Sequence, residues 1–208
     1  MYKFIKRTFD IVLSLFGIIV CLPIFIFIFI WIKIDSRGPV FFKHRRVGQK
    51  GKILYIYKFR TMVKDAETMV SNFTEAQKKE WEENYKLKND PRITKAGKFL
   101  RKTSLDELPQ LFNILKGEMS FVGPRPDVAG YADKLQGDDR KILELRPGIT
   151  GPASIKYRHE DKILAQQKDP KKYNDEIIYP DKVRINLDYY ENWSFFLDIK
   201  IIFQTLFG

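Results

Sequence analysis

The sequence has few of the residues on which many enzyme mechanisms depend. Its 208 residues include one cysteine, Cys21, and two histidines, His44 and His159. A single thiol excludes an intrachain disulfide, and the two histidines lack metal-ligand spacing. The chain also lacks a P-loop, a G-x-G-x-x-G motif and a G-x-S-x-G motif. Serine–histidine–aspartate and cysteine–histidine mechanisms are therefore poor explanations of this sequence.

Acidic residues are in the minority. The chain has 37 Lys and Arg residues against 26 Asp and Glu residues, which gives a formal charge of +11. This excess suits an anionic partner, which can be nucleic acid, an anionic lipid surface or a phosphorylated substrate. With 44% hydrophobic residues the chain should fold, and its length predicts one domain, or one domain and an anchor.

One long segment carries no charge at all. Residues 11–32 are apolar, and as a helix these 22 residues reach ~33 Å at ~1.5 Å each, about the thickness of a bilayer's hydrocarbon core. The run is too long for a signal peptide and no small-residue cleavage site follows it. It is apolar on every face, which argues against a core helix of a soluble protein. We therefore expect residues 1–36 to form a membrane anchor.

Pro23 lies near the middle of this run. A proline has no N–H and clashes with the carbonyl group four residues back, so we expect the helix to break there. Both flanks are basic, and positive residues prefer the cytoplasmic side of a membrane. These flanking residues are Lys3, Lys6 and Arg7 before the run and Lys33, Arg37, Lys43, Arg45 and Arg46 after it. A re-entrant helix that bends at Pro23 places both flanks on one side and is favoured over a kinked full span.

Residues 37–208 should form one compact unit that is mainly helical. Val40–Phe42 and residues 53–59 are β-branched or aromatic runs separated by a turn-like segment, which predicts a β hairpin. Residues 63–90 are highly charged and indicate a solvated helix or loop. A short basic amphipathic stretch covers residues 93–102. The fold class predicted is α+β, with a small β hairpin among helices.

Further helices are expected in the second half of the chain. Leucines and a phenylalanine recur at helical spacing over residues 105–115, and Gly117 is suited to end that helix. Residues 123–126 form a proline-rich rigid loop. Residues 127–145 look helical. The aromatic tail at residues 193–207 predicts an amphipathic helix at the membrane interface, although an ordinary core helix fits almost as well.

The adjacent acids Asp106 and Glu107 invite two interpretations. Ser104 and Glu107 match the S-x-x-E capping box, and Pro109 suits the first turn of a helix. From spacing alone, a capping role that only favours the helix dipole is the better interpretation. The functional alternative uses the same geometry. A carboxylate that is kept ionised beside a phosphate-binding helix end can act as a nucleophile or a Mg²⁺ ligand.

Two carboxylates that face a phosphorylated substrate need countercharge. The chain offers basic residues in tight proline- or glycine-containing contexts. We also expect a divalent cation such as Mg²⁺ to contribute positive charge. Arg125, between two prolines, is suited to bidentate phosphate contact. The predicted substrate-binding residues are Lys58, Arg60, Arg101, Arg125 and Arg146.

Three blocks carry a resemblance to a known family. They are YKFRTM (57–62), DPRITKAGKFLRKTSLDELPQLFNILKGEMSFVGPRP (90–126) and LRPGITG (145–151), behind an apolar N-terminal helix. Together they resemble the bacterial sugar transferase family, the monotopic phosphoglycosyl transferases. The resemblance covers nearly the whole chain, in the short form that lacks the additional N-terminal membrane region of larger members.

The resemblance implies a reaction. A UDP-sugar would donate its sugar phosphate to polyprenol (undecaprenyl) phosphate and release UMP by a ping-pong mechanism. Asp106 would be the nucleophile and contact Mg²⁺, Glu107 would be its partner, and Arg101, Arg125 and Arg146 would lie near the donor. The enzyme would be monotopic in the bacterial cytoplasmic membrane, with its catalytic domain facing the cytoplasm. Its partners would be these substrates and membrane lipid, not nucleic acid, and a homodimer is left open.

Two departures from the family pattern limit what can be carried over. Leu22 precedes Pro23 where many members have a serine, whose hydroxyl can satisfy a freed carbonyl group. Residues 152–156 replace the family's usual sequence, so the sugar cannot be named. The competing hypotheses are a basic membrane-anchored binding protein and a non-catalytic scaffold of a glycan-assembly complex. Neither needs Asp106 and Glu107.

Overall fold

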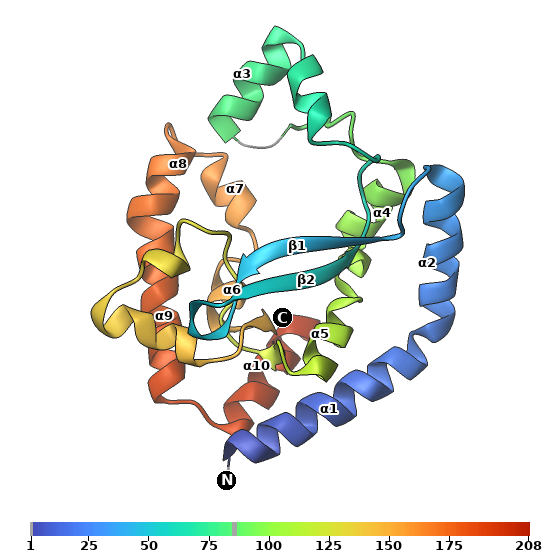
Figure 1. Cartoon of the computed structure of the whole chain (residues 1–208). Coiled ribbons are helices and arrows are strands. Elements are labelled where there is room, and N and C mark those ends of the chain that lie inside the picture. Colours follow the sequence, from blue (N-terminus) through green and yellow to red (C-terminus); the bar gives the residue numbers. More distant parts are fainter. Residues whose placement is uncertain (1, 85–86) are drawn as a thin grey trace.

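The computed structural model describes residues 2–84 and 87–208 and is mainly helical, as predicted (Figure 1). The helices are α1 (Tyr2–Val20), α2 (Leu22–Asp35), α3 (Glu75–Asn84), α4 (Lys95–Thr103), α5 (Gln110–Lys116), α6 (Pro152–Lys156), α7 (Glu160–Leu164), α8 (Pro170–Tyr173), α9 (Tyr179–Glu191) and α10 (Phe195–Phe207). The strands are β1 (Phe41–Val47), β2 (Ile53–Phe59), β3 (Ser120–Val122) and β4 (Gly148–Thr150).

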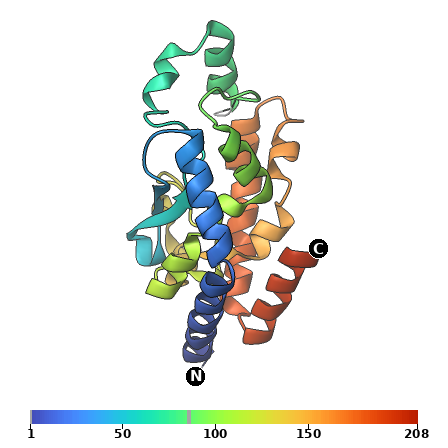
Figure 2. The ribbon, with the colours of Figure 1, turned by 90° about the vertical axis from the view of Figure 1, so that its right-hand side faces the viewer.

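The apolar N-terminal run is broken where the sequence predicts it. Within the described residues no single helix is long and apolar enough to cross a membrane, but Phe4–Val20 and Leu22–Asp35 together are, with a bend of 59° between them. Pro23 lies in the first turn of α2, where its missing N–H breaks the hydrogen-bond ladder. In Figure 1 α1 runs along the bottom of the molecule and α2 along its right-hand side, and in Figure 2 the pair faces the viewer.

The α2 helix buries one narrow stripe and exposes the rest. Phe25, Ile28 and Ile32 pack with Leu100 of α4 in one buried cluster. The exposed apolar residues of α2 are Leu22, Ile24, Ile26, Phe27, Phe29, Ile30 and Ile34. Exposed apolar surface of this extent marks a site of contact with a partner or a membrane.

Polar contacts fix α1 to the rest of the chain. The Asp10 carboxylate is buried and accepts hydrogen bonds from the Ser120 hydroxyl at 3.0 Å and the Phe121 amide at 3.1 Å. Lys6 forms an ion pair of 2.5 Å with Asp198 of α10. The α10 helix lies beside α1 in both views (Figures 1 and 2). The first helix is therefore packed on the compact part of the chain and is not a free appendage.

The β hairpin is longer than predicted. Strand β2 covers the expected residues, but β1 extends through Val47, because pairing with β2 holds its polar residues in the ladder from Phe41–Phe59 to Val47–Ile53. A short parallel pair, β3 with β4, was not predicted. At three residues each, these strands are too short to show a pattern.

The expected capping box does not form. Ser104 adopts a left-handed conformation (φ 56°) that ends α4, and its side chain makes no capping hydrogen bond. Leu105–Glu107 form a single 3₁₀ turn, and α5 begins only at Gln110, after Pro109. The predicted start of this helix was therefore wrong, whereas the predicted end at Gly117 (φ 85°) is confirmed.

Other predicted segments have mixed outcomes. Residues 127–145 contain 3₁₀ turns at Ala132–Lys134 and Gly137–Glu144 and not the expected α-helix, because Gly130 and Gly137 turn the chain at positive φ. The charged segment 63–90 contains α3 and a 3₁₀ turn, and its residues 85 and 86 lie outside the described residues. The amphipathic stretch forms α4 and the aromatic tail forms α10, as predicted.

Gly97 fixes the distance between α4 and the end of the hairpin. A Cβ atom at this position would lie 1.9 Å from the backbone oxygen of Thr61. We expect Gly97→Ala to destabilise the fold by about 1–3 kcal/mol, because backbone atoms have to move. A thermal melt of the purified protein in detergent checks this, with the exposed Lys98→Ala in the same helix as the control. Equal melting temperatures for the two variants would contradict the packing described.

Candidate active site

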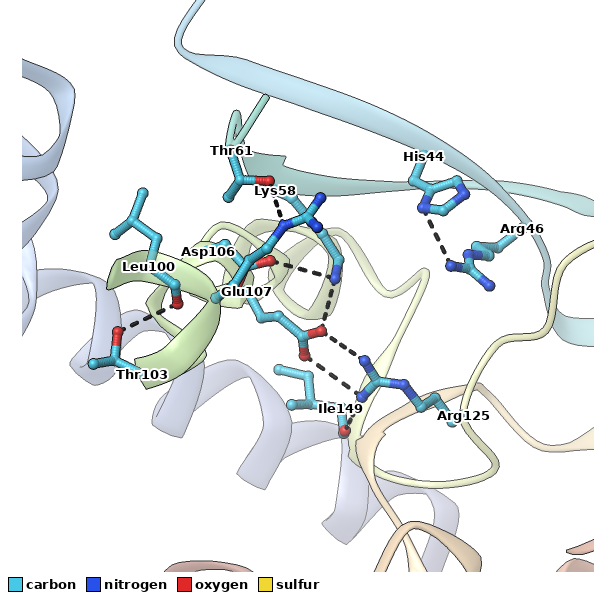
Figure 3. Close-up of polar contacts among 11 residues, drawn as sticks. His44, Arg46, Lys58, Thr61, Leu100, Thr103, Asp106, Glu107, Arg125 and Ile149 are labelled. Carbon is cyan, nitrogen blue, oxygen red and sulfur yellow. Dashed lines mark hydrogen bonds and ion pairs between the residues drawn. The ribbon is translucent and has the colours of Figure 1, made fainter. Parts of the chain in front are cut away.

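Asp106 and Glu107 lie in the 3₁₀ turn between α4 and α5, which faces strand β2. Lys58 of β2 bridges the two carboxylates (Figure 3). Its Nζ lies 2.7 Å from Glu107 Oε1 and 3.6 Å from Asp106 Oδ2. The structure therefore brings Lys58 to the adjacent pair Asp106 and Glu107, which is distant from it in the sequence, and all three were predicted as site residues.

Arg125 completes the cluster from the proline-rich loop. Its Nη2 lies 2.6 Å from Glu107 Oε1, and its Nη1 is 3.4 Å from the backbone oxygen of Ile149 (Figure 3). The Arg125 side chain is still 53% exposed, so part of its guanidinium remains open to an incoming anion. Glu107 thus has two cationic partners, whereas Lys58 is the only described residue that forms an ion pair with Asp106.

The net pKa shift differs between the two carboxylates, although burial acts on both in the same direction. Burial raises the pKa of Asp106, against the charges of Lys58 and Arg101, while the neighbouring Glu107 charge raises it further. Burial also favours a higher pKa for Glu107, but Arg125 and Lys58 outweigh it and the net pKa is lowered. The rise for Asp106 is opposite to the expectation from a helix N-terminus, because Asp106 precedes α5 in a short buried turn. Glu107 is therefore held as an anion by two cations. Asp106 has a raised pKa and a single, longer ion pair.

The other predicted basic residues are distributed over three places. Arg101 lies at the site, where its charge lowers the pKa of Asp106 while its Nε donates to the Thr61 hydroxyl at 2.9 Å. Arg60 is buried and donates to the backbone oxygens of Ser36 and Arg37, at the end of α2.

Arg146 lies on the α1 side of the molecule. There its charge acts on Arg7, and it is not among the described residues that line the cavity next to Glu107. The structure thus gathers Lys58, Arg101 and Arg125 at the acidic pair, but places Arg60 and Arg146 elsewhere.

Two residues at the site were missed as functional candidates. Arg46 of β1 lies close enough to Glu107 and Arg125 for their charges to act on it. Its Nη2 is 3.2 Å from Nδ1 of His44, and burial together with Arg46 and Lys58 lowers the pKa of His44 to about 4. The register of the hairpin would have identified both residues. Phe42 pairs with Lys58, and alternate residues of a strand point to the same face, so Phe42, His44 and Arg46 lie on the face of Lys58.

A cavity of about 850 Å³ opens beside Glu107, whereas Asp106 and Lys58 are not among its described lining residues. Glu107 and Arg125 lie on its wall, and Asp127, Tyr179 and Asn186 lie on other parts of the lining. A volume of this size suits a small-molecule ligand of several rings.

The residues at the site fit a divalent cation only in one binding mode. The described residues contain no cluster of three or more histidine, cysteine, aspartate or glutamate side chains that could hold a metal by themselves. Mg²⁺ often takes one or two carboxylates and completes its shell with substrate phosphates and water. Asp106 fits this mode, since Glu107 is already paired with Lys58 and Arg125.

A carboxylate held beside cations at the edge of a large cavity, on a chain with exposed apolar helices, suits a transferase for a phosphorylated substrate. The chain belongs to the bacterial sugar transferase family, whose sequence profile matches residues 1–208.

Several curated proteins are similar to the chain. It is 40% identical over 207 residues to an undecaprenyl-phosphate galactose phosphotransferase of Salmonella typhimurium, covering 98% of the chain and 40% of that protein. It is 36% identical to a UDP-glucose:undecaprenyl-phosphate glucose-1-phosphate transferase of Escherichia coli, covering 99% of the chain and 40% of that protein. The exopolysaccharide production protein ExoY of Sinorhizobium fredii is 35% identical, with 97% of the chain and 83% of that protein covered. The chain thus spans about two fifths of the length of the first two relatives.

Proposed function

We propose that this enzyme transfers a sugar phosphate from a UDP-sugar to polyprenol (undecaprenyl) phosphate and releases UMP. The observation that carries the proposal is the cluster of Lys58, Asp106, Glu107 and Arg125, of which Glu107 and Arg125 line the cavity. The names of the relatives in Salmonella typhimurium and Escherichia coli support this substrate class. The product would be the first membrane-bound intermediate of a bacterial glycan.

The chemistry proposed is a two-step displacement. A carboxylate oxygen of Asp106 attacks the β-phosphorus of the donor, the bond from that phosphorus to the bridging oxygen breaks, and UMP leaves with that oxygen. An oxygen of polyprenol phosphate then attacks the same phosphorus and breaks its bond to Asp106. Lys58 and Arg125 stabilise the negative charge that develops on the phosphoryl oxygens.

Mg²⁺ is proposed as the cofactor. When bound, it would offset the charge of the diphosphate and polarise a phosphoryl oxygen. Asp106 is the residue that would hold it, with the remaining ligands from phosphate and water. Arg101 would keep Asp106 oriented through its hydrogen bond to Thr61 and its charge on the carboxylate.

The proposed location is the cytoplasmic face of the bacterial inner membrane. The exposed apolar residues of α1 and α2 would enter the lipid as a re-entrant pair. Those of α10, which include Phe196, Phe203 and Phe207, would lie at the interface. The acidic pair would then face the surface at which the head group of polyprenol phosphate is found.

The reaction is tested with purified protein, Mg²⁺, polyprenol phosphate and a panel of UDP-sugars, with UMP as the readout. We expect UMP from at least one donor, and its release should stop when EDTA removes the divalent cation. No UMP from any donor would instead support a non-catalytic scaffold.

The re-entrant topology predicts that both ends of the helix pair lie on one side of the membrane. Thr8 and Arg37 are exposed and flank the apolar run, so each can be replaced by cysteine in a Cys21→Ala background. In spheroplasts an impermeant maleimide should label neither cysteine until the membrane is opened, and should then label both. Labelling of one position from each side would establish a kinked full span.

A further inference from the structure

The lining of the cavity beside Glu107 contains two chemically different sets of residues. Glu107 and Arg125 belong to one set, and with Lys58 close to Glu107 its cations suit phosphate. The other set comes from α9 and from the chain that follows the proline-rich loop. A ligand that carries both a charged diphosphate and uncharged polar groups would suit this lining, with the diphosphate at the cations and the uncharged groups at the other residues.

The described cations on the α9 wall already have partners within the chain. Lys182 of α9 forms an ion pair of 2.6 Å with Glu160. Arg158, which also lines the cavity, donates to the backbone oxygens of Gln204 and Gly208 at the end of α10. With its described cations engaged, this wall is poorly suited to a second phosphate.

Neutral and acidic hydrogen-bonding groups remain there. The Tyr179 hydroxyl lies 3.4 Å from Asp127 Oδ2, which is at the outer limit of a hydrogen bond. Burial raises the pKa of Asp127 to about 6, although Lys182, Tyr179 and Arg46 act to lower it and Glu160 raises it. This carboxyl group is therefore able to accept a hydrogen bond, or to donate one when protonated.

Asn186 supplies a second, independent observation. It is only 7% exposed and lines the cavity, yet its buried Oδ1 accepts no hydrogen bond from any described residue. Buried polar atoms without a partner are rare in native proteins and each needs an explanation; a ligand hydroxyl group that reached this oxygen would supply the missing partner.

We propose that Asp127, Tyr179 and Asn186 form a subsite that binds hydroxyl groups of the nucleotide-sugar donor. This proposal rests on the proposed function, because it assumes that a nucleotide-sugar donor enters the cavity with its phosphates at Arg125 and its hydroxyl groups at the subsite. Hydroxyl groups come from either the sugar or the ribose of such a donor, and both pair with carboxyl, phenol and carboxamide groups. A site built to hydrogen-bond a hydroxyl group strongly rejects a ligand that lacks it.

The variants Asn186→Leu and Tyr179→Phe keep side-chain shape while removing the hydrogen-bonding groups. Donor affinity is measured by calorimetry in an Asp106→Asn background, so that no turnover occurs. We expect each variant to weaken binding of the preferred UDP-sugar by about 10- to 100-fold. Asn186→Leu should leave the melting temperature unchanged or raise it, because it removes an unsatisfied buried oxygen. Tyr190→Phe, the same change on α9 outside the cavity lining, is the control and should bind normally.

Two further donors identify which hydroxyl groups the subsite binds. One carries a sugar that lacks a single hydroxyl group, and the other carries 2′-deoxyuridine with the preferred sugar. If the subsite binds the sugar, the variants should lose affinity for the 2′-deoxy donor but not for the deoxysugar donor. The pattern reverses if the subsite binds the ribose.

Equal losses for every donor, or no loss for any, would overturn the subsite. So would a large drop in melting temperature for Asn186→Leu, which would show a structural role. Failure of the proposed function is seen separately: wild-type protein would then release no UMP, whatever the α9 variants bind.

Discussion

Asp106→Asn is expected to reduce UMP release by about 10⁴-fold or more, because a carboxamide cannot form the phosphosugar ester. Asparagine has nearly the same size and leaves Lys58 paired with Glu107 at 2.7 Å, so the site should keep its shape. The donor alone, without polyprenol phosphate, should yield one equivalent of UMP with wild-type protein and none with the variant. Mass spectrometry of the wild-type protein should find the added sugar phosphate on the peptide that contains Asp106.

Two further variants test whether the loss of UMP release is specific to Asp106. Asp138→Asn removes an exposed carboxylate, with 86% of its side chain accessible, and should release UMP at the wild-type rate. Glu107→Gln should slow turnover yet still form the adduct, because in the proposed mechanism Glu107 only holds Lys58 and Arg125 and does not attack phosphorus. An adduct on Glu107, or undiminished turnover in Asp106→Asn, would refute the assignment of the nucleophile.

The features predicted correctly from sequence are those with a strong local cause. Pro23 breaks the N-terminal run because proline has no N–H to donate, whatever surrounds it. The β-branched and aromatic residues of Ile53–Phe59 favour a strand, and Gly117 ends α5 because it accepts a positive φ.

The errors arise where tertiary contacts decide. Ser104 has the sequence of a helix cap but is instead left-handed, because the chain turns there to direct Asp106 and Glu107 at Lys58. Strand β1 carries four polar residues in succession, and only its pairing with β2 identifies it as a strand. Such pairing is a property of two segments, so a pattern in one of them cannot show it.

The same limit applies to the site. Lys58 and Arg60 are two positions apart, and in a continuous strand both would lie on one face. Strand β2 ends at Phe59, however, and Arg60 instead reaches the carbonyl groups that end α2. The sequence could identify both as candidate phosphate-binding residues. Only the packing of α2 on the hairpin shows that Lys58 lies at the acidic pair and Arg60 does not.

Lys58→Met is expected to have the second-largest effect, a fall in turnover of about 10²- to 10³-fold. The variant loses the ammonium group that lies 3.6 Å from Asp106 and 2.7 Å from Glu107 and that would also face the phosphoryl oxygens. Lys43→Met is the matched control, because Lys43 pairs with Tyr57 on the opposite face of the same hairpin. It should retain most of the activity.

The pH profile separates the two roles of Lys58. In the proposed mechanism Asp106 attacks only as a carboxylate. Burial already raises its pKa, while Lys58 acts to lower it. Removing Lys58 therefore raises this pKa further, so the protonated and inactive form persists to higher pH. The acidic limb of single-turnover UMP release should move to higher pH in Lys58→Met and stay in place in Lys43→Met. If turnover falls while that limb stays fixed, Lys58 acts on the substrate phosphates alone, and the ionisation of Asp106 must be set by Arg101 and by its buried turn.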